Sequence, residues 1–158
     1  MSDPTIEAAA KLLEDSLGAM REEVAGADPQ ALNWRPAGED TNSIAVLTVH
    51  SLASTRWWLS VATGVSLPER DRPSEFLASA EHVDELLSHF DAMAKDCSSL
   101  LQEAGAFDAG AQREANRGRS DDSEVVSAAW ALMHALEHLR EHVAHAQLTR
   151  QLWDQRKD

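Results

Sequence analysis

The sequence predicts an all-α fold, a four-helix bundle formed by a single domain over residues 1–158. Three observations support this prediction. Apolar residues recur at the 3.6-residue period of amphipathic helices, strand-like alternation is almost absent, and the helical stretches are separated by segments with proline, glycine and polar residues. Two connections are longer than ten residues. The pattern therefore leaves open whether the helices simply alternate in direction or include a crossover.

The first helix is expected over residues 4–25, because Asp3 can cap its start and Gly26 can end it. Residues 27–40 then form a loop that contains a short turn of helix. Trp34 is the large apolar side chain of this loop, and we expect it to anchor the loop to the core.

The second helix is expected to start after Thr41 or Asn42, which are both favourable N-cap residues. It ends near Thr63, because Gly64 supplies the residue type that terminates helices most readily. Most of its positions are apolar.

Two further helices follow a connection that contains two prolines and a single expected helical turn at residues 74–77. The third helix is expected over residues 80–104. Residues 107–119 are polar and contain glycine, which predicts a loop. The fourth helix is expected to begin at residues 120–123 and to continue to about Asp154, which makes it the longest of the four.

The charge balance excludes several classes of function. The chain has 14 Lys and Arg residues against 27 Asp and Glu residues, so its formal net charge is −13. Phosphate backbones and anionic lipids repel such a chain, so we expect neither nucleic acid nor a membrane as partner. No apolar run approaches the roughly 20 residues that cross a bilayer, and no secretion signal is recognised. The single cysteine, Cys97, cannot form an internal disulfide, which favours a cytoplasmic protein.

The histidines are unevenly distributed. Four of the seven lie in one stretch of twelve residues inside the last predicted helix: His134, His138, His142 and His145. At 100° per residue they occupy a sector of about 80° on one helix face. A fifth, His50, lies in the middle of the apolar second helix, whereas His82 and His89 lie beside acidic residues and are expected at the surface.

The spacing of His138 and His142 allows both imidazoles to meet one divalent ion, because side chains at i and i+4 project from successive turns. One more ligand from a facing helix would make a three-ligand site with an open coordination position, as in catalytic zinc sites. Two structural alternatives remain. His50 could be a hydrogen-bonded core histidine, and the four histidines could form a surface ridge neutralised by Glu137 and Glu141.

Several short motifs resemble the DinB-like (YfiT-type) family of metal-dependent four-helix proteins. The motifs are Leu32-Asn33-Trp34-Arg35-Pro36, Asn42-Ser43-Ile44-Ala45, His50, Trp57-Trp58 and the segment His138–Ala146. In that family a loop of this kind caps the helix that brings the first histidine ligand, and a pair of ligands four residues apart follows in the last helix. Ala144 stands where the family usually has glycine.

The resemblance implies that His50, His138 and His142 bind a divalent metal, zinc first, with nickel or iron as alternatives. A second register stays open, because Glu141 and His145 also have i,i+4 spacing and resemble the Glu-x-x-x-His variant of mycothiol-dependent isomerase relatives. The residues that follow the ligand pair in the family motif favour His138 and His142 as the ligands.

The function that the resemblance implies is thiol-dependent transfer or isomerisation. The open position would bind and deprotonate a thiol or a water, and a low-molecular-weight thiol such as bacillithiol or mycothiol would attack a small electrophile. Arg35 and Arg56 are the basic candidates for a thiol that carries carboxylates. The resemblance also implies a homodimer, with the long last helix and Trp153 as the expected interface.

Two other functions remain open from the residues alone. One is a metal-binding or stress-associated protein without turnover, and the other is an unmetallated bundle that acts as a dimerisation module. Trp34, Trp57, Trp58, Trp130 and Trp153 are expected in the core and at interfaces, although any of them near His50 could wall a pocket. Cys97 is expected to be a small buried residue and not a nucleophile.

Overall fold

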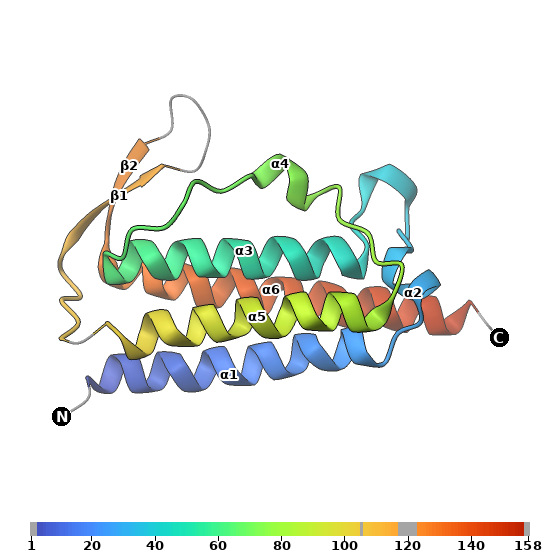
Figure 1. The fold of residues 1–158 in the computed structure, drawn as a ribbon, viewed down its shortest axis with the longest axis horizontal. Coiled ribbons are helices and arrows are strands. Elements are labelled where there is room, and N and C mark those ends of the chain that lie inside the picture. The colour runs from blue at the N-terminus through green and yellow to red at the C-terminus, as the bar shows by residue number, and fades with distance from the viewer. Residues whose placement is uncertain (1–2, 105, 117–122, 157–158) are drawn as a thin grey trace.

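The structure, a computed structural model, describes residues 3–104, 106–116 and 123–156. It confirms the helical bundle: four long helices lie side by side (Figure 1). They are α1 (Pro4–Ala25), α3 (Ile44–Thr63), α5 (Val83–Gln102) and α6 (Ala128–Gln155). Helix α3 packs against both α5 and α6, and α1 covers the opposite side of the same two helices.

The sequence left open whether the helices alternate in direction or include a crossover, and the structure shows a crossover. Figure 1 shows that α3 and α5 run in the same direction, whereas α1 and α6 run the opposite way. Residues 64–82 therefore travel back along the length of the bundle, and they pass over α3 on their way. This crossover connection carries the short helix α4 (Arg72–Glu75), which starts two residues before the predicted turn.

The first helix has the predicted bounds and the predicted caps. The side chain of Asp3 accepts a hydrogen bond from the N–H of Thr5 at 2.8 Å, and Gly26 ends the helix. The predicted turn in the following loop is helix α2 (Pro29–Asn33), and a 3₁₀ turn, η1 (Gly38–Asp40), follows it.

Trp34 anchors this loop as expected. The ring centroids of Trp34 and Trp153 lie 5.6 Å apart, and the guanidinium of Arg156 lies 4.8 Å from the Trp34 ring. Trp153 thus packs against a residue of its own chain.

Helix α3 begins one residue later than expected, because its N-cap is Ser43 and not Thr41 or Asn42. The Ser43 hydroxyl accepts the N–H of Val46 at 3.2 Å. Thr41 instead holds the preceding turn, where its hydroxyl accepts the N–H of Ala37 at 3.0 Å. The predicted end is confirmed, since Gly64 adopts a left-handed conformation with φ of 77°.

The third helix is shorter at both ends than the predicted span over 80–104. His82 precedes it, without a side-chain capping bond, and Glu103 follows it. The exposed positions predicted for His82 and His89 are confirmed.

A two-stranded hairpin lies where the sequence predicted a loop and the start of the fourth helix. Strand β1 (Gln112–Asn116) pairs antiparallel with β2 (Ser123–Ser127), so residue 123 is extended and the helix begins at Ala128. Two adjacent valines in β2 favour the extended form, and Ser127 caps α6 by accepting the N–H of Trp130 at 3.1 Å. Residues 117–119 of the predicted loop and residues 120–122 lie outside the described residues.

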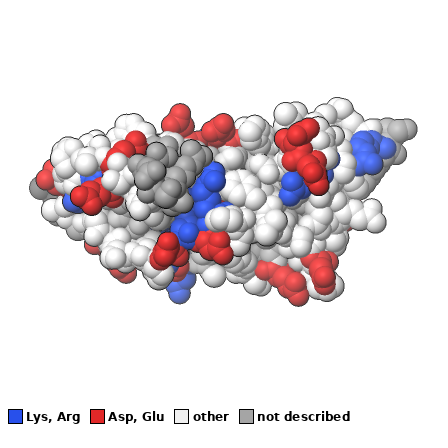
Figure 2. Space-filling view, turned by 90° about the horizontal axis from the view of Figure 1, so that it is seen from above, with Lys and Arg blue, Asp and Glu red and all other residues white. Residues whose placement is uncertain are grey.

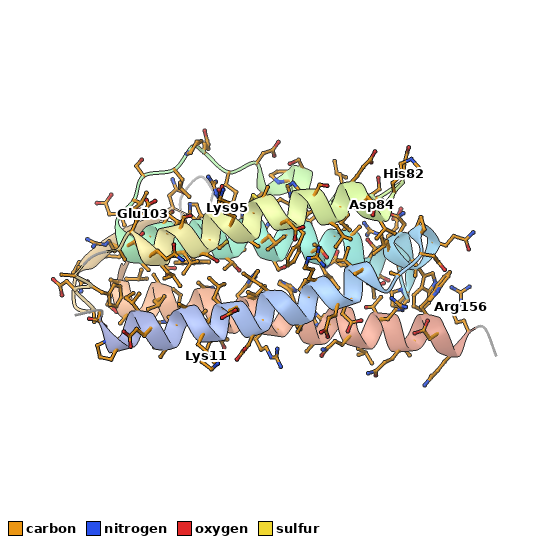
Figure 3. The ribbon with its side chains drawn as sticks, turned by 60° about the horizontal axis from the view of Figure 1, so that its bottom comes forward. Lys11, His82, Asp84, Lys95, Glu103 and Arg156 are labelled. Atoms are coloured by element: carbon orange, nitrogen blue, oxygen red, sulfur yellow. The ribbon has the colours of Figure 1, made fainter. Side chains whose placement is uncertain are left out.

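The core fills the space between the four long helices. Its fully buried side chains include Met20, Leu59, Phe90, Leu132 and Leu139. Polar side chains at the surface point away from this core, as the six labelled residues in Figure 3 show. Cys97 is a free cysteine and is buried as predicted, and burial raises the pKa of its thiol to about 12, which disfavours the thiolate at neutral pH. Among the described residues no helix is long and apolar enough to cross a membrane.

Candidate metal centre

Helices α3 and α6 bring three histidines together at the middle of the bundle. His50 of α3 is buried at 6% exposure, and His138 and His142 lie half-buried on successive turns of α6. The ring centroid of His50 lies 5.3 Å from that of His138 and 5.1 Å from that of His142. Leu139 and Val143, the residues next to the two α6 histidines, are fully buried and hold this stretch of the helix against the core.

The nitrogen atoms of the three rings are close enough to share one ion. One nitrogen of each ring lies within 4.8 Å of the others. The Nε2 atoms of His138 and His142 are 3.2 Å apart. Two imidazole nitrogens that bind one tetrahedral zinc at about 2.0–2.1 Å lie about 3.3 Å from each other. The three histidines therefore fit a divalent ion, and two Nε2 atoms at this distance must either share a proton or face a common cation.

Burial keeps the two α6 histidines neutral. It lowers the pKa of His138 to about 3, with help from the neighbouring charges of His142 and His50. It also lowers the pKa of His142 to about 4, where His50 again contributes. Neutral imidazoles carry the lone pair that a metal ion needs, so the site is ready for a cation at pH 7.

A carboxylate orients the third ring. Nδ1 of His50 lies 2.9 Å from Oε2 of Glu75, which α4 brings over the site, and Glu75 is itself 5% exposed. Arg70 donates two hydrogen bonds of 2.6 Å to the same carboxylate. Burial alone would raise the pKa of Glu75, but the bonds from His50 and Arg70 outweigh it and the pKa is lowered. Since an ionised carboxylate only accepts, Nδ1 of His50 carries the proton, and Nε2 is the ring nitrogen that can offer a lone pair to a cation.

Sequence reasoning missed Arg70 and Glu75. Both lie in the crossover connection, and no spacing rule connects this segment with a histidine on α3. The only local signal is a pair of opposite charges five residues apart in a segment rich in proline.

The remaining histidines of α6 lie beside the cluster and not in it. His134 stacks on Trp130 with ring centroids 4.7 Å apart, and its Nδ1 lies 3.6 Å from a carboxylate oxygen of Glu137. His145 is exposed, and so is Glu141. In the part of the chain that the structure describes, the group whose ligand atoms lie close together consists of His50, His138 and His142 and does not include Glu141 or His145.

A cavity of about 250 Å³ opens beside the three histidines. It is lined by His50, Ser54, Trp57, Trp58, Arg70, Arg72, His134 and His138. Two of the five tryptophans thus wall the space next to His50. Its lining combines tryptophan and histidine rings with the guanidinium groups of Arg70 and Arg72, so it can hold a small polar ligand.

The basic residues of the cavity differ from those that the sequence suggested. Arg35 donates to the backbone carbonyls of Thr41 and Phe76, and Arg56 pairs with Asp96 at 3.0 Å. Neither lines the cavity. Arg35 and Arg56 were chosen because they are close in sequence to the site residues. Arg70 and Arg72 reach the cavity through the crossover connection instead.

Comparisons with known proteins give a family match and similar folds. The family model of mycothiol-S-transferase matches residues 9–155. A crystal structure of a conserved protein from Enterococcus faecalis superposes with a TM-score of 0.71 and 15% identity, over 96% of this chain and 98% of that one. A mutant of mycothiol-dependent maleylpyruvate isomerase superposes with a TM-score of 0.65 and 13% identity, over 88% of this chain and 59% of that one. None of the curated proteins matches the sequence.

Proposed function

The chain belongs to the mycothiol-S-transferase family, which is DinB-like, and from this membership and the site geometry we propose a metal-dependent thiol S-transferase. His50, His138 and His142 would bind one divalent ion. The proposal rests on one observation above all: a nitrogen atom of each ring lies within 4.8 Å of the other two, although two helices far apart in sequence supply them.

We propose zinc first, with nickel or iron as alternatives. Three neutral imidazoles suit several divalent first-row metals, so availability decides among them. Three protein ligands leave one position open for a ligand from solution. When bound there, the ion supplies a positive charge that lowers the pKa of a thiol or a water next to it.

The chain's own residues have three tasks in this proposal. Glu75 holds the proton on Nδ1 of His50 and thereby presents Nε2 to the site. Trp57 and Trp58 wall the cavity and limit the access of water to it. The low pKa values of His138 and His142 keep the histidines from competing for the proton that the thiol releases.

The substrates are proposed by class. A low-molecular-weight thiol, mycothiol by the name of the family and bacillithiol as the alternative, gives up its proton to solvent. Its sulfur then attacks a small electrophile, so that a carbon–sulfur bond forms and the leaving group departs with its electron pair.

We further propose a homodimer and a cytoplasmic location. Exposed apolar residues of α6, namely Trp130, Met133, Leu148 and Leu152, support an interface along that helix. The intramolecular packing of Trp153 against Trp34 argues that other residues of α6 form most of such an interface. The free Cys97 and a thiol substrate both suit a reducing compartment.

Two measurements test the enzyme proposal. Elemental analysis of protein purified without a histidine tag or chelating resin should find close to one divalent ion per chain. The metal-loaded protein should then accelerate the consumption of mycothiol or bacillithiol by members of an electrophile panel. Metal without acceleration would favour a non-catalytic metal-binding protein, and absence of both would favour an unmetallated helical module.

A further inference from the structure

Arg72 of α4 lines the cavity beside the three histidines and has no carboxylate partner among the described residues. Other arginines of this acidic chain are paired with carboxylates: Arg21 with Asp91, Arg56 with Asp96, Arg70 with Glu75 and Arg150 with Asp154. The guanidinium of Arg72 instead lies 5.0 Å from the ring centroid of Phe76. Its charge is therefore available to a ligand.

The surroundings hold this guanidinium close to the reactive part of the site. The Phe76 ring that supports Arg72 lies 4.5 Å from the ring of His50, so one aromatic ring separates the cation from a proposed metal ligand. Arg72 is half-buried, which reduces the screening of its charge by water. Figure 2 shows basic side chains at the middle of the face that carries the crossover connection, with acidic side chains around them.

Arg70 differs from Arg72 although both line the same cavity. The carboxylate of Glu75 occupies the Nε and Nη2 donors of Arg70. Glu75 also accepts from His50, so the pair serves to orient that ring. Of the two arginines that line the cavity, Arg72 is the one that pairs with no carboxylate of the described residues.

We propose that Arg72 determines specificity by binding a carboxylate on a ligand that occupies this cavity. An arginine fork matches the two oxygens of a carboxylate, and stacking on Phe76 orients it in advance. The inference deepens the proposed function, because the ligand is taken to react at the neighbouring histidines. The carboxylate could belong to the electrophile or to the thiol, and the experiment has one arm for each.

The first experiment measures binding and needs no turnover. Succinate and its neutral diamide, succinamide, are titrated into the purified protein while tryptophan fluorescence is recorded, because Trp57 and Trp58 line the same cavity. We expect saturable binding of succinate and a preference for it over succinamide. Arg72→Gln should weaken succinate binding about ten-fold or more, as expected for a lost charge-assisted bond, and Arg72→Lys should retain part of it.

Arg56→Gln is the matched control. It removes the same charge from the chain, but Arg56 pairs with Asp96 and does not line the cavity. Its succinate affinity should stay within about two-fold of the wild type, because long-range charge effects at physiological salt are small. Equal weakening in both variants, equal affinity for succinate and succinamide, or no saturable binding would overturn the proposal.

The second experiment identifies which substrate carries the carboxylate. Iodoacetate carries a carboxylate where iodoacetamide carries a neutral amide, and N-acetylcysteine and its amide differ in the same way. In each reaction a carbon–sulfur bond forms, iodide leaves and the thiol proton passes to buffer. In Arg72→Gln, a rise in KM confined to iodoacetate assigns the electrophile, and one confined to N-acetylcysteine assigns the thiol. An equal rise for charged and neutral partners contradicts carboxylate recognition. Succinate binding without any turnover would instead overturn the proposed S-transferase and leave the role of Arg72 standing.

Discussion

Nδ1 of His50 lies 2.9 Å from Oε2 of Glu75, although 25 residues separate the two in the chain. Both side chains are buried, and Arg70 donates to both oxygens of the same carboxylate. This contact joins the crossover connection to the histidine cluster. It makes the geometry of the site depend on a segment that belongs to none of the four long helices.

Removing the two α6 histidines should remove the metal. The variant His138→Ala/His142→Ala is expected to bind less than a tenth of the metal that the wild type binds, because one remaining imidazole forms a weak site. Circular dichroism should show unchanged helix content, since both residues are half-buried. The control is Glu141→Ala/His145→Ala, which removes an exposed pair with the same spacing on the same helix. Loss of metal in the control alone would transfer the site to that pair.

Glu75→Gln should weaken metal binding about 10- to 100-fold, the usual cost of losing a carboxylate behind a histidine ligand. The amide keeps the size of the side chain but no longer fixes the proton on Nδ1 of His50. Glu75→Asp should restore part of the affinity. Glu69→Gln, an exposed acid of the same connection, serves as the control, and a competition titration with a chromophoric chelator measures all of them. Wild-type affinity in Glu75→Gln would refute the positioning role.

The metal-free protein should lose stability as the pH falls below about 6.5. His138 and His142 have folded-state pKa values of about 3 and 4, far below the ordinary value of 6.5. In that range the unfolded chain binds more protons than the folded one, so stability is complete above pH 6.5 and declines toward pH 4. The pKa of Glu75 is lowered from 4.5, so its contribution is lost only at more acidic pH.

Thermal unfolding of chelator-treated protein at pH 7.5, 6.5, 5.5 and 5.0 measures this decline. A His138→Asn/His142→Asn variant should show a flatter profile over the same range, because it lacks both groups. If the variant and the wild type lose stability in parallel, other groups cause the decline.

The start of α6 can be tested by a capping substitution. Ser127→Ala should lower the free energy of unfolding by about 1 kcal/mol, because the hydroxyl that accepts the N–H of Trp130 is lost. Ser123→Ala, at the start that the sequence predicted, should change it by less than about 0.5 kcal/mol. Denaturant titrations of the two variants compare them directly. A larger loss at Ser123 would favour a helix that begins there.

Local sequence signals were sufficient to identify the four long helices and to place both ends of α1 and the C-terminal end of α3. The caps of α1 and the left-handed end of α3 depend on contacts within a few residues, and Asp3, Gly26 and Gly64 are found in the predicted roles. The hairpin was missed because β2 is stable only when paired with β1, and the register that pairs Glu114 with Val125 is a contact between separate segments. The third helix was predicted too long because helix ends carry weaker signals than helix centres.

The sequence by itself determined the bundle and the face of α6 that gathers its histidines, and its motifs resemble those of the family to which the chain belongs. Periodicity and residue spacing carry the first two of these, because they are properties of a helix taken alone. Only the tertiary structure decided that α3 and α5 run parallel, that their connection passes over the site, and that Arg70, Arg72 and Glu75 reach it. These facts depend on the packing of whole helices against one another, which no local pattern of residues encodes.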